Sequence, residues 1–299
     1  MKEKILVVGG TGFIGTHIIK GLSLKKYIIF SLSKKIPQKK KLNGIRYIAS
    51  DIRVFKKLKK KIFLYDFDHV INLSGYVDHS NKKENFLCHY IGTKNLIDIF
   101  KFKKIKSFIQ IGSSLEYGNQ KSPQRESGYC KPKGSYAISK FKASKYIQKI
   151  GNKKKIPYII LRAYQVYGPG QKKNRLIPIV IDACYKNKKF NCTSGFQKRD
   201  FIYIDDFVSL IKKILIKKTI RNKIYNVGFG KPIKVRTVIS KIQSYIKFGK
   251  PQFGKIPMRK EEIKTLYPSI KKISKDFNWV PKQKLSNGLK KTILSYAEY

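Results

Sequence analysis

The sequence predicts an α/β fold in which a doubly wound parallel sheet is joined to a smaller C-terminal domain. Short apolar runs alternate with amphipathic stretches through the first half of the 299-residue chain, and the first run leads into a glycine-rich turn. The alternation breaks down after Arg162. Strands that alternate with helices form parallel βαβ units, whose helices cover the faces of one sheet. The chain is also long enough to bury a full core.

The elements of the first half follow one another in a regular order. Amphipathic stretches that indicate helices cover residues 13–24, 86–100 and 136–150. Short apolar runs that indicate strands lie at residues 4–8, 27–31, 46–49, 69–75, 107–114 and 158–162. Each of these helices joins two strands, as the crossover connections of a parallel sheet require.

The second half is richer in proline and glycine and contains one more strand–helix unit, at residues 199–215, and a strand at residues 223–228. We therefore expect residues 1–165 plus 201–226 to carry the sheet. Residues 166–200 plus 227–299 are expected to form a lid built from two separated pieces of chain.

The chain is strongly basic, with 67 Lys and Arg against 17 Asp and Glu and a formal net charge of +50. The excess is mostly lysine, spread along the whole chain in runs of at most three, which is typical of a genome-wide codon bias. A dedicated nucleic-acid surface would cluster its charge and use more arginine. We therefore expect nonspecific binding to polyanions at low salt but no specific nucleic-acid partner.

Neither a metal site nor a membrane segment is indicated. The four cysteines are scattered, without a C-x-x-C pair or a histidine at ligand spacing, which argues against zinc and against a disulfide framework. The apolar run near the start, residues 5–8, is stopped by glycines and is too short for a membrane span or a signal peptide. We expect a cytoplasmic protein that does not insert into a membrane.

The turn "VVGGTGFIG", residues 7–15, predicts a dinucleotide-binding (Rossmann) domain. Gly9 would allow the tight turn, Gly12 would let the main chain approach a pyrophosphate, and Gly15 would let the following helix pack close to the strand. The N-terminus of that helix would face the negative charge of the phosphates.

The end of the second strand bears on the choice between NAD and NADP. A carboxylate there would bind the ribose of NAD, whereas positive charge accommodates the extra phosphate of NADP. The sequence offers Ser33, Lys34 and Lys35 and no acid, which slightly favours NADP. Asp51, after the third apolar run, is placed either to accept a hydrogen bond from adenine or to cap the next helix.

Tyr136 and Lys140 in "GSYAISK" are four residues apart, so on a helix they would share one face. A nearby ammonium lowers the pKa of a phenol, which would make the tyrosine a usable proton donor and acceptor. The same spacing also occurs in many helices that carry no catalytic group, so the pair alone does not decide between the two interpretations.

Further motifs decide it, because they occur in one order along nearly the whole chain: "GGTGFIG", Asp51, "VINLSG", "GTKNLI", "GSSLEYG", "YAISK", "LRAYQVYGPG", "RDFIYIDD" and "NWVPKQKLSNGL". Together they resemble the extended short-chain dehydrogenase/reductase family, in particular its NAD-dependent epimerase/dehydratase group, which modifies nucleotide sugars. The resemblance implies catalysis by Ser113, Tyr136 and Lys140. It also implies a nucleotide-sugar substrate and a homodimer.

The resemblance assigns two further sets of residues. The cofactor, NAD or NADP, is expected to contact Gly9, Gly12, Phe13, Ile14, Gly15, Ser33, Lys34, Asp51, Ile52, Leu73, Ser74, Gly75, Tyr136 and Lys140. The nucleotide sugar is expected to contact Ser113, Ser114, Gln165, Asn174, Arg199 and Arg259. Arginine suits a diphosphate because its planar fork donates two hydrogen bonds at once.

Departures from the family pattern narrow the reaction. Family 4,6-dehydratases carry an acid–base pair directly after the catalytic Ser/Thr, where this chain has Ser114 and Leu115. Leucine cannot transfer a proton, so we expect hydride transfer at C4 of the sugar, by a 4-epimerase or a 4-ketoreductase, and no dehydration. His89 and Gln165 replace two asparagines of the family. A noncatalytic member that senses the cofactor or binds nucleic acid is the alternative.

Overall fold

The computed structural model describes residues 1–38, 41–76, 78, 80–217, 219–258 and 262–297. Its centre is a seven-stranded sheet in which all neighbouring strands are parallel. From one edge to the other the strands are β3 (Ile45–Ala49), β2 (Tyr27–Ser33), β1 (Glu3–Val8), β4 (His69–Asn72), β5 (Ser107–Ser113), β6 (Tyr158–Ala163) and β11 (Lys223–Val227). The strand order reverses between β1 and β4, so the sheet is doubly wound as predicted.

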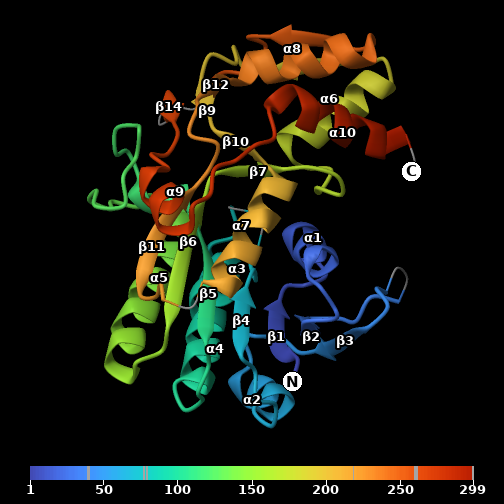
Figure 1. Cartoon of the computed structure of the whole chain (residues 1–299). Helices are drawn as coiled ribbons and strands as arrows, with labels where there is room; N and C mark the ends of the chain where they lie inside the picture. The colour runs from blue at the N-terminus through green and yellow to red at the C-terminus, as the bar shows by residue number, and fades with distance from the viewer. Residues whose placement is uncertain (39–40, 77, 79, 218, 259–261, 298–299) are drawn as a thin grey trace.

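Two layers of helices cover the sheet (Figure 1). Their bounds are α1 (Phe13–Gly21), α2 (Phe55–Ile62), α3 (Lys82–Asn85), α4 (Gly92–Phe100), α5 (Gly134–Lys154), α7 (Ile204–Ile216) and α9 (Lys271–Phe277). Side chains of β1 alternate between the two layers, because Ile5 and Val7 pack in the core that includes α1 and α7, whereas Leu6 and Val8 pack in the core that includes α2 and α4.

The lid lies beyond the carboxyl ends of the strands, at the top of Figure 1. It contains α6 (Leu176–Tyr185), β8 (Lys189–Cys192), β9 (Lys198–Arg199), β12 (Ile233–Lys234), α8 (Val235–Ile246), β13 (Lys250–Phe253), β14 (Thr265–Leu266) and α10 (Leu285–Ala297). The two pieces of chain are joined by the pairing of β8 with β13 and of β9 with β12 and β14. Helix α8 packs against both α6 and α10.

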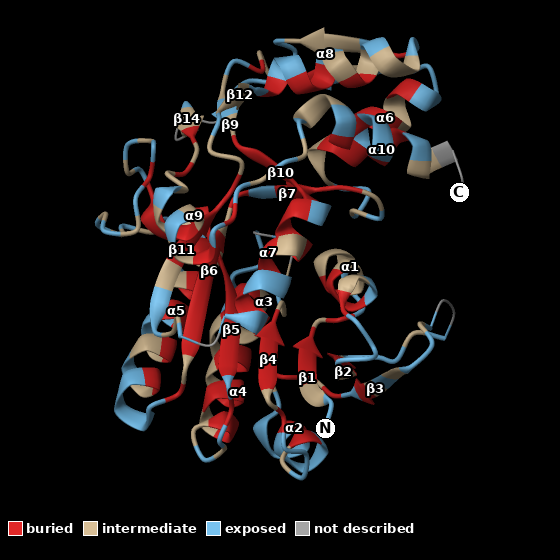
Figure 2. Ribbon diagram, in the orientation of Figure 1, coloured by how far each residue is buried: buried red, intermediate tan, exposed pale blue. Residues whose placement is uncertain are grey.

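The lid and the sheet share one continuous apolar core. This core runs from Ile5 of β1 through Phe207 of α7 to Val238 of α8 and Leu289 of α10, all of them fully buried. Figure 2 shows the buried strands at the centre of the sheet and the exposed outer faces of the helices. The two-stranded sheet of β7 (Gln165–Tyr167) and β10 (Phe201–Tyr203) lies where the chain passes between the two parts.

Three details differ from the regular pattern that the sequence predicted. The helix expected at residues 86–100 begins earlier, with α3, and contains a π-helical segment, η1 (Phe86–Ile91), before α4. Helix α2 was not predicted, and α9, which lies in the stretch assigned to the lid, packs against α7 and β11. The exact domain boundaries remain a prediction. Among the described residues, no helix combines the length and the apolar character that a membrane crossing needs.

Candidate active site

The glycine turn between β1 and α1 leaves room that side chains would fill. Gly9 has a φ of +78°, in the left-handed region that favours glycine. A Cβ on Gly15 would lie 2.4 Å from the carbonyl oxygen of Gly9, so only glycine lets α1 approach the strand this closely. A Cβ on Gly12 would meet only that same oxygen, at 3.3 Å. The turn therefore fits the pyrophosphate of a dinucleotide, at the open N-terminus of α1.

A cleft of about 640 Å³ extends from this turn to the lid. It follows the carboxyl ends of β1, β4 and β5, where doubly wound sheets bind their ligands. It brings together most of the predicted cofactor residues: Gly9, Gly12, Phe13, Ile14, Gly15, Leu73, Ser74, Gly75, Tyr136 and Lys140. Of the predicted substrate residues, it is lined by Ser113, Ser114, Gln165 and Asn174.

The remaining predicted cofactor residues lie outside the cleft lining, near the ends of β2 and β3. Asp51 binds the guanidinium of Arg53 with oxygen–nitrogen distances of 2.6–3.0 Å, and this hydrogen bonding holds the pKa of its carboxyl below the usual value. Lys34 lies 4.0 Å from the same carboxylate, and the Ser33 hydroxyl donates to the carbonyl of Lys35.

The alternative role of Asp51 as a helix cap is wrong, because α2 begins only at Phe55 and its N-cap residue is Val54. The Asp51 carboxylate instead accepts a hydrogen bond from the backbone N–H of Arg53. Ile52, the next predicted cofactor residue, is buried. Its carbonyl accepts a hydrogen bond from the side-chain amide of Asn95 in α4, which fixes the main chain beside Asp51.

Ser113, Tyr136 and Lys140 meet in the middle of the cleft. Ser113 ends β5, and the other two residues lie in the first two turns of α5. The Ser113 hydroxyl forms a hydrogen bond with the Tyr136 phenol, which lowers the pKa of that phenol. The Lys140 ammonium is buried and donates to the carbonyl oxygen of Ile111 at 2.8 Å.

The acidities of this pair differ from the sequence-based expectation. Burial raises the pKa of Tyr136, whereas a lowering by Lys140 was expected. The effects that oppose burial are the Ser113 hydrogen bond and the positive charge of Arg175. Burial also lowers the pKa of Lys140 to about 8, because an ammonium loses hydration there. The spacing of Tyr136 and Lys140 could be predicted from the sequence, but the burial that sets their pKa values could not.

His89 packs against the catalytic candidate Tyr136, with ring centroids 4.9 Å apart in an edge-on arrangement. It lies in the π-helical segment η1, and its Nε2 lies 3.1 Å from the carbonyl oxygen of Tyr76. Gly75 makes room for this ring, because a Cβ there would lie 2.6 Å from the imidazole. The histidine at this position therefore places an aromatic ring beside the tyrosine.

Of the two predicted substrate arginines, Arg199 does not line the cleft. Arg199 donates to the carbonyls of Lys198 and Ile263, each at 2.7 Å, and forms an ion pair with Glu262. Its guanidinium is thereby engaged within the lid. Arg259 lies outside the described residues.

Sequence reasoning missed Arg175, which lines the cleft directly before α6. Its guanidinium forms no hydrogen bond or ion pair within the described part of the chain, and its positive charge lowers the pKa of Tyr136. The available signal was its position beside Asn174 in "KKNRLIP".

The cleft has a positive electrostatic character. Lys140, Lys172 and Arg175 line it, and none of its lining residues in the described part of the chain is an aspartate or glutamate. Such a lining suits ligands with several negative charges, such as two diphosphates. Nowhere among the described residues do three or more His, Cys, Asp or Glu side chains gather in a way that could hold a metal ion.

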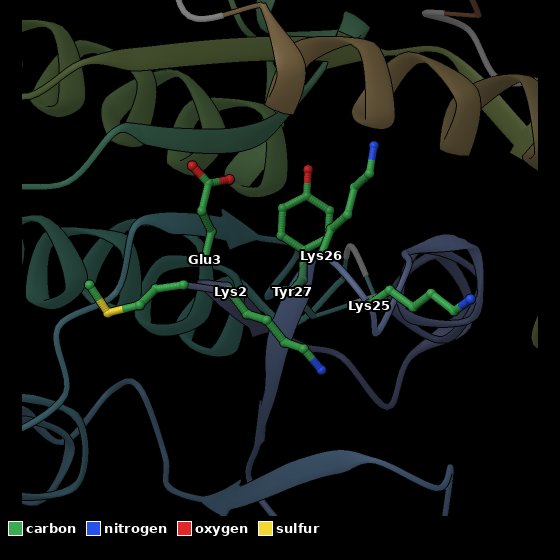
Figure 3. A pocket seen from close by; sticks show the side chains of 6 residues that line it. Lys2, Glu3, Lys25, Lys26 and Tyr27 are labelled. Atoms are coloured by element: carbon green, nitrogen blue, oxygen red, sulfur yellow. The ribbon is translucent and has the colours of Figure 1, made fainter.

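A second hollow, of about 540 Å³, lies at the amino ends of β1 and β2 (Figure 3). The side chains of Lys2, Lys25 and Lys26 diverge around it. The carboxylate of Glu3 is already bound to Lys106, at 2.8 Å. This hollow is at the opposite end of the sheet from the glycine turn, and its charged groups do not converge on a common point.

Comparison with known proteins agrees with the geometry of the cleft. A model of the NAD dependent epimerase/dehydratase family matches residues 5–228. The chain is 30% identical to a putative UDP-glucose 4-epimerase of Methanocaldococcus jannaschii, over 97% of each chain. It is 28% identical to the dTDP-D-glucose 4,6-dehydratase of Homo sapiens, over 99% of this chain and 90% of the human protein.

A solved structure extends the comparison to three dimensions. The UDP-glucuronic acid 4-epimerase from Bacillus cereus, in complex with UDP-glucuronic acid and NAD, has a TM-score of 0.88 and is 25% identical, over 99% of this chain and 100% of that one. The family match covers most of the chain, including the glycine turn and the Ser113, Tyr136 and Lys140 cluster. The chain belongs to the NAD-dependent epimerase/dehydratase family.

Proposed function

We propose that this protein is an NAD(P)-dependent enzyme that transfers hydride at C4 of a nucleotide-diphosphate hexose. The observation that supports this most strongly is the meeting of Ser113, Tyr136 and Lys140 in a cleft that starts at the glycine turn. A bound nicotinamide would accept or supply the hydride. The residues of the chain would bind and orient the cofactor and the sugar, and they would move the proton.

Each of the three residues has a distinct role in this proposal. Tyr136 takes the proton of the C4 hydroxyl or returns it, since its phenol is the acid–base group in the cleft. Ser113 hydrogen-bonds the same sugar oxygen and holds the phenol in place. Lys140 supplies a buried positive charge and hydrogen bonds for the cofactor's ribose.

The lid would grip the nucleotide sugar. Asn174 and Arg175 precede α6 at the mouth of the cleft, and Gln165 lies on its wall. An arginine at this place can donate two hydrogen bonds to one diphosphate. The relative from Bacillus cereus, bound to UDP-glucuronic acid and NAD, supports a ligand pair of this kind. Arg199 could contact the substrate only after a rearrangement of the lid, because its guanidinium is bound to Glu262 and to backbone carbonyls. Arg259 stays a predicted substrate residue.

Dehydration is not part of the proposal, although dehydratases are among the relatives. The positions after Ser113 are Ser114 and Leu115, and both line the cleft. The neighbouring carboxylate, Glu116, is fully buried and bound to Arg162 away from the cleft. Elimination of water needs an acid and a base at C5 and C6, and the described cleft lining offers no carboxylate for it.

The proposal keeps two questions open to experiment. An epimerase returns the hydride to the same sugar and regenerates its cofactor, whereas a ketoreductase consumes it. The absence of a carboxylate at Ser33 and Lys34 supports NADP slightly, which fits a ketoreductase.

A homodimer is also proposed, and light scattering of the purified protein tests it.

A ligand screen by thermal shift tests the proposed function. A ligand that binds only the folded protein raises its stability with the logarithm of ligand concentration. We expect shifts for NAD or NADP and for at least one UDP-, CDP-, dTDP- or GDP-hexose, and conversion of that sugar at C4. Cofactor binding without turnover of any nucleotide sugar would favour a noncatalytic sensor.

A further inference from the structure

A buried carboxylate outside the cleft lining contacts the main chain of the catalytic cluster at Ser113. Glu116 lies in η2 (Ser114–Tyr117) and is 0% exposed. Its Oε1 accepts the backbone N–H of Ser113 at 2.8 Å, and its Oε2 accepts the Ser144 hydroxyl at 2.8 Å and Arg162 Nε at 3.1 Å. A buried carboxylate is tolerated only with such partners, which here come from β5, α5 and β6.

The space around Glu116 is built for this contact. A Cβ on Gly112 would lie 2.5 Å from its Oε1, so glycine is needed at that position for the carboxylate to reach the main chain of Ser113. The Ser113 hydroxyl in turn accepts the N–H of Leu115 at 3.2 Å, which completes a capping box at the end of β5. The orientation of Ser113 therefore depends on Glu116.

Glu116 also lies close to Lys140. The Ser144 hydroxyl that it accepts follows Lys140 by four residues, one turn, on α5. From this place its negative charge opposes the effect of burial and raises the pKa of the Lys140 ammonium.

The other charged or titratable groups around the cluster include Tyr136 on α5 itself and His89 in η1, whose ring packs against Tyr136. They also include Arg162 on β6, which pairs with Glu116, and Arg175 from the lid, whose positive charge lowers the pKa of Tyr136. Among the charged groups in the described part of the chain, Glu116 is the one whose charge opposes the effect of burial on the pKa of Lys140.

We propose that Glu116 is a positioning residue for the proposed reaction: its carboxylate fixes the main chain of Ser113 and supplies a negative charge near the buried Lys140. The effect of Glu116 on turnover rests on the proposed function. The contacts and the charge effect concern the free protein and can be measured without any substrate.

The test compares Glu116→Gln with Ser144→Ala. The first variant keeps the size and a hydrogen-bond acceptor but removes the charge. The second removes one donor to the same carboxylate and keeps the charge. The measurement is the rate at which acetic anhydride acylates Lys140, followed by peptide mass spectrometry as a function of pH. In the wild type the midpoint is expected near pH 8.

Glu116→Gln is expected to lower this midpoint by about one pH unit, the effect of losing one nearby opposite charge. Ser144→Ala is expected to leave it in place. In turnover assays Glu116→Gln lowers kcat while KM for the nucleotide sugar stays within about threefold, because only the catalytic cluster is disturbed. An unchanged midpoint in Glu116→Gln would overturn the inference and leave Glu116 a purely structural residue.

Removal of the charge could unfold the protein, because Arg162 would be buried without a counter-charge. The double variant Glu116→Gln/Arg162→Met removes both charges and is expected to show the same shift of the Lys140 midpoint. An unchanged midpoint in this double variant contradicts the inference in the same way. A shifted midpoint in a protein that converts no nucleotide sugar would refute the proposed function and retain the role of Glu116 toward Lys140.

Discussion

Lys140 is held in the cleft at a cost to stability. Its pKa is lowered to about 8 in the folded protein, because burial penalises the ammonium. In the unfolded chain the group keeps its ordinary, higher pKa, so between these two values the unfolded state binds more protons. The free energy of unfolding therefore carries the full penalty below about pH 8 and recovers as pH rises above it.

The variant Lys140→Met is expected to stabilise the protein at pH 7. The desolvation penalty that this variant removes is about 3 kcal/mol, at roughly 1.4 kcal/mol per pKa unit. The lost hydrogen bond to Ile111 reduces the net gain in stability by about 1 kcal/mol. Urea unfolding at pH 7 and pH 9.5 measures this gain, which shrinks at the higher pH. A destabilised variant at pH 7, or a gain independent of pH, would contradict the burial of a charged lysine.

Arg175 and Arg199 form a matched pair of lid arginines. Arg175→Gln is expected to weaken nucleotide-sugar binding by roughly 10- to 100-fold, the effect of losing a hydrogen bond to a charged group of ~1.5–3 kcal/mol. Arg199→Gln is expected to change that affinity less than threefold, because its guanidinium is bound to Glu262 and to backbone carbonyls. Calorimetry with the cofactor-loaded protein distinguishes them, and the reverse ranking would restore Arg199 to the substrate site.

These two arginines show what the sequence could and could not predict at this scale. Ser113, Tyr136 and Lys140 sit in motifs with fixed local spacing, so they were found and do meet in the cleft. The direction in which an arginine of the lid points depends on contacts between distant segments, such as Arg199 with Glu262. The pKa of Tyr136 depends on burial, which no local motif records.

At the scale of elements, the glycine turn offers a prediction that separates folding from cofactor binding. A Cβ on Gly15 would collide with the backbone of Gly9 and Gly10, so Gly15→Ala should destabilise the protein by about 1–3 kcal/mol. Gly12→Ala meets only the Gly9 carbonyl, at 3.3 Å, and should keep the wild-type stability within about 0.5 kcal/mol.

The same Gly12→Ala variant should bind the dinucleotide at least about tenfold more weakly, because its methyl group occupies the approach to the pyrophosphate. Thermal unfolding and dinucleotide titration of the two variants provide the measurement. If Gly12→Ala bound the dinucleotide as the wild type does, the turn would not be the pyrophosphate site.

The strands and the crossover helices of the first half were predictable because their apolar periodicity is local. The π-helical segment η1 was not predictable, since it interrupts a helix without changing the apolar pattern, and it carries His89 to Tyr136. The short lid strands β9, β12 and β14 contain two residues each, too few for a periodic signal. Their pairing joins segments that are far apart in the chain.

At the scale of the whole molecule, the net charge of +50 predicts how the protein binds nucleic acid. Binding to a generic duplex should be independent of sequence and should fade as salt approaches physiological concentration, because it comes from released counterions. Fluorescence anisotropy with two unrelated duplexes between 0.02 and about 0.15 M salt measures this. Submicromolar, sequence-selective binding at the higher salt would support the nucleic-acid-binding alternative.

The most direct test of the proposed hydride transfer is a nucleotide hexose labelled with deuterium at C4. For an epimerase the label should return to C4 of the product, and for a ketoreductase run in reverse it should pass to the nicotinamide. In both cases Tyr136→Phe should slow the transfer by at least ~10²-fold with little change in cofactor affinity. Label lost to water, label moved to C6, or an active Tyr136→Phe variant would contradict the proposed function.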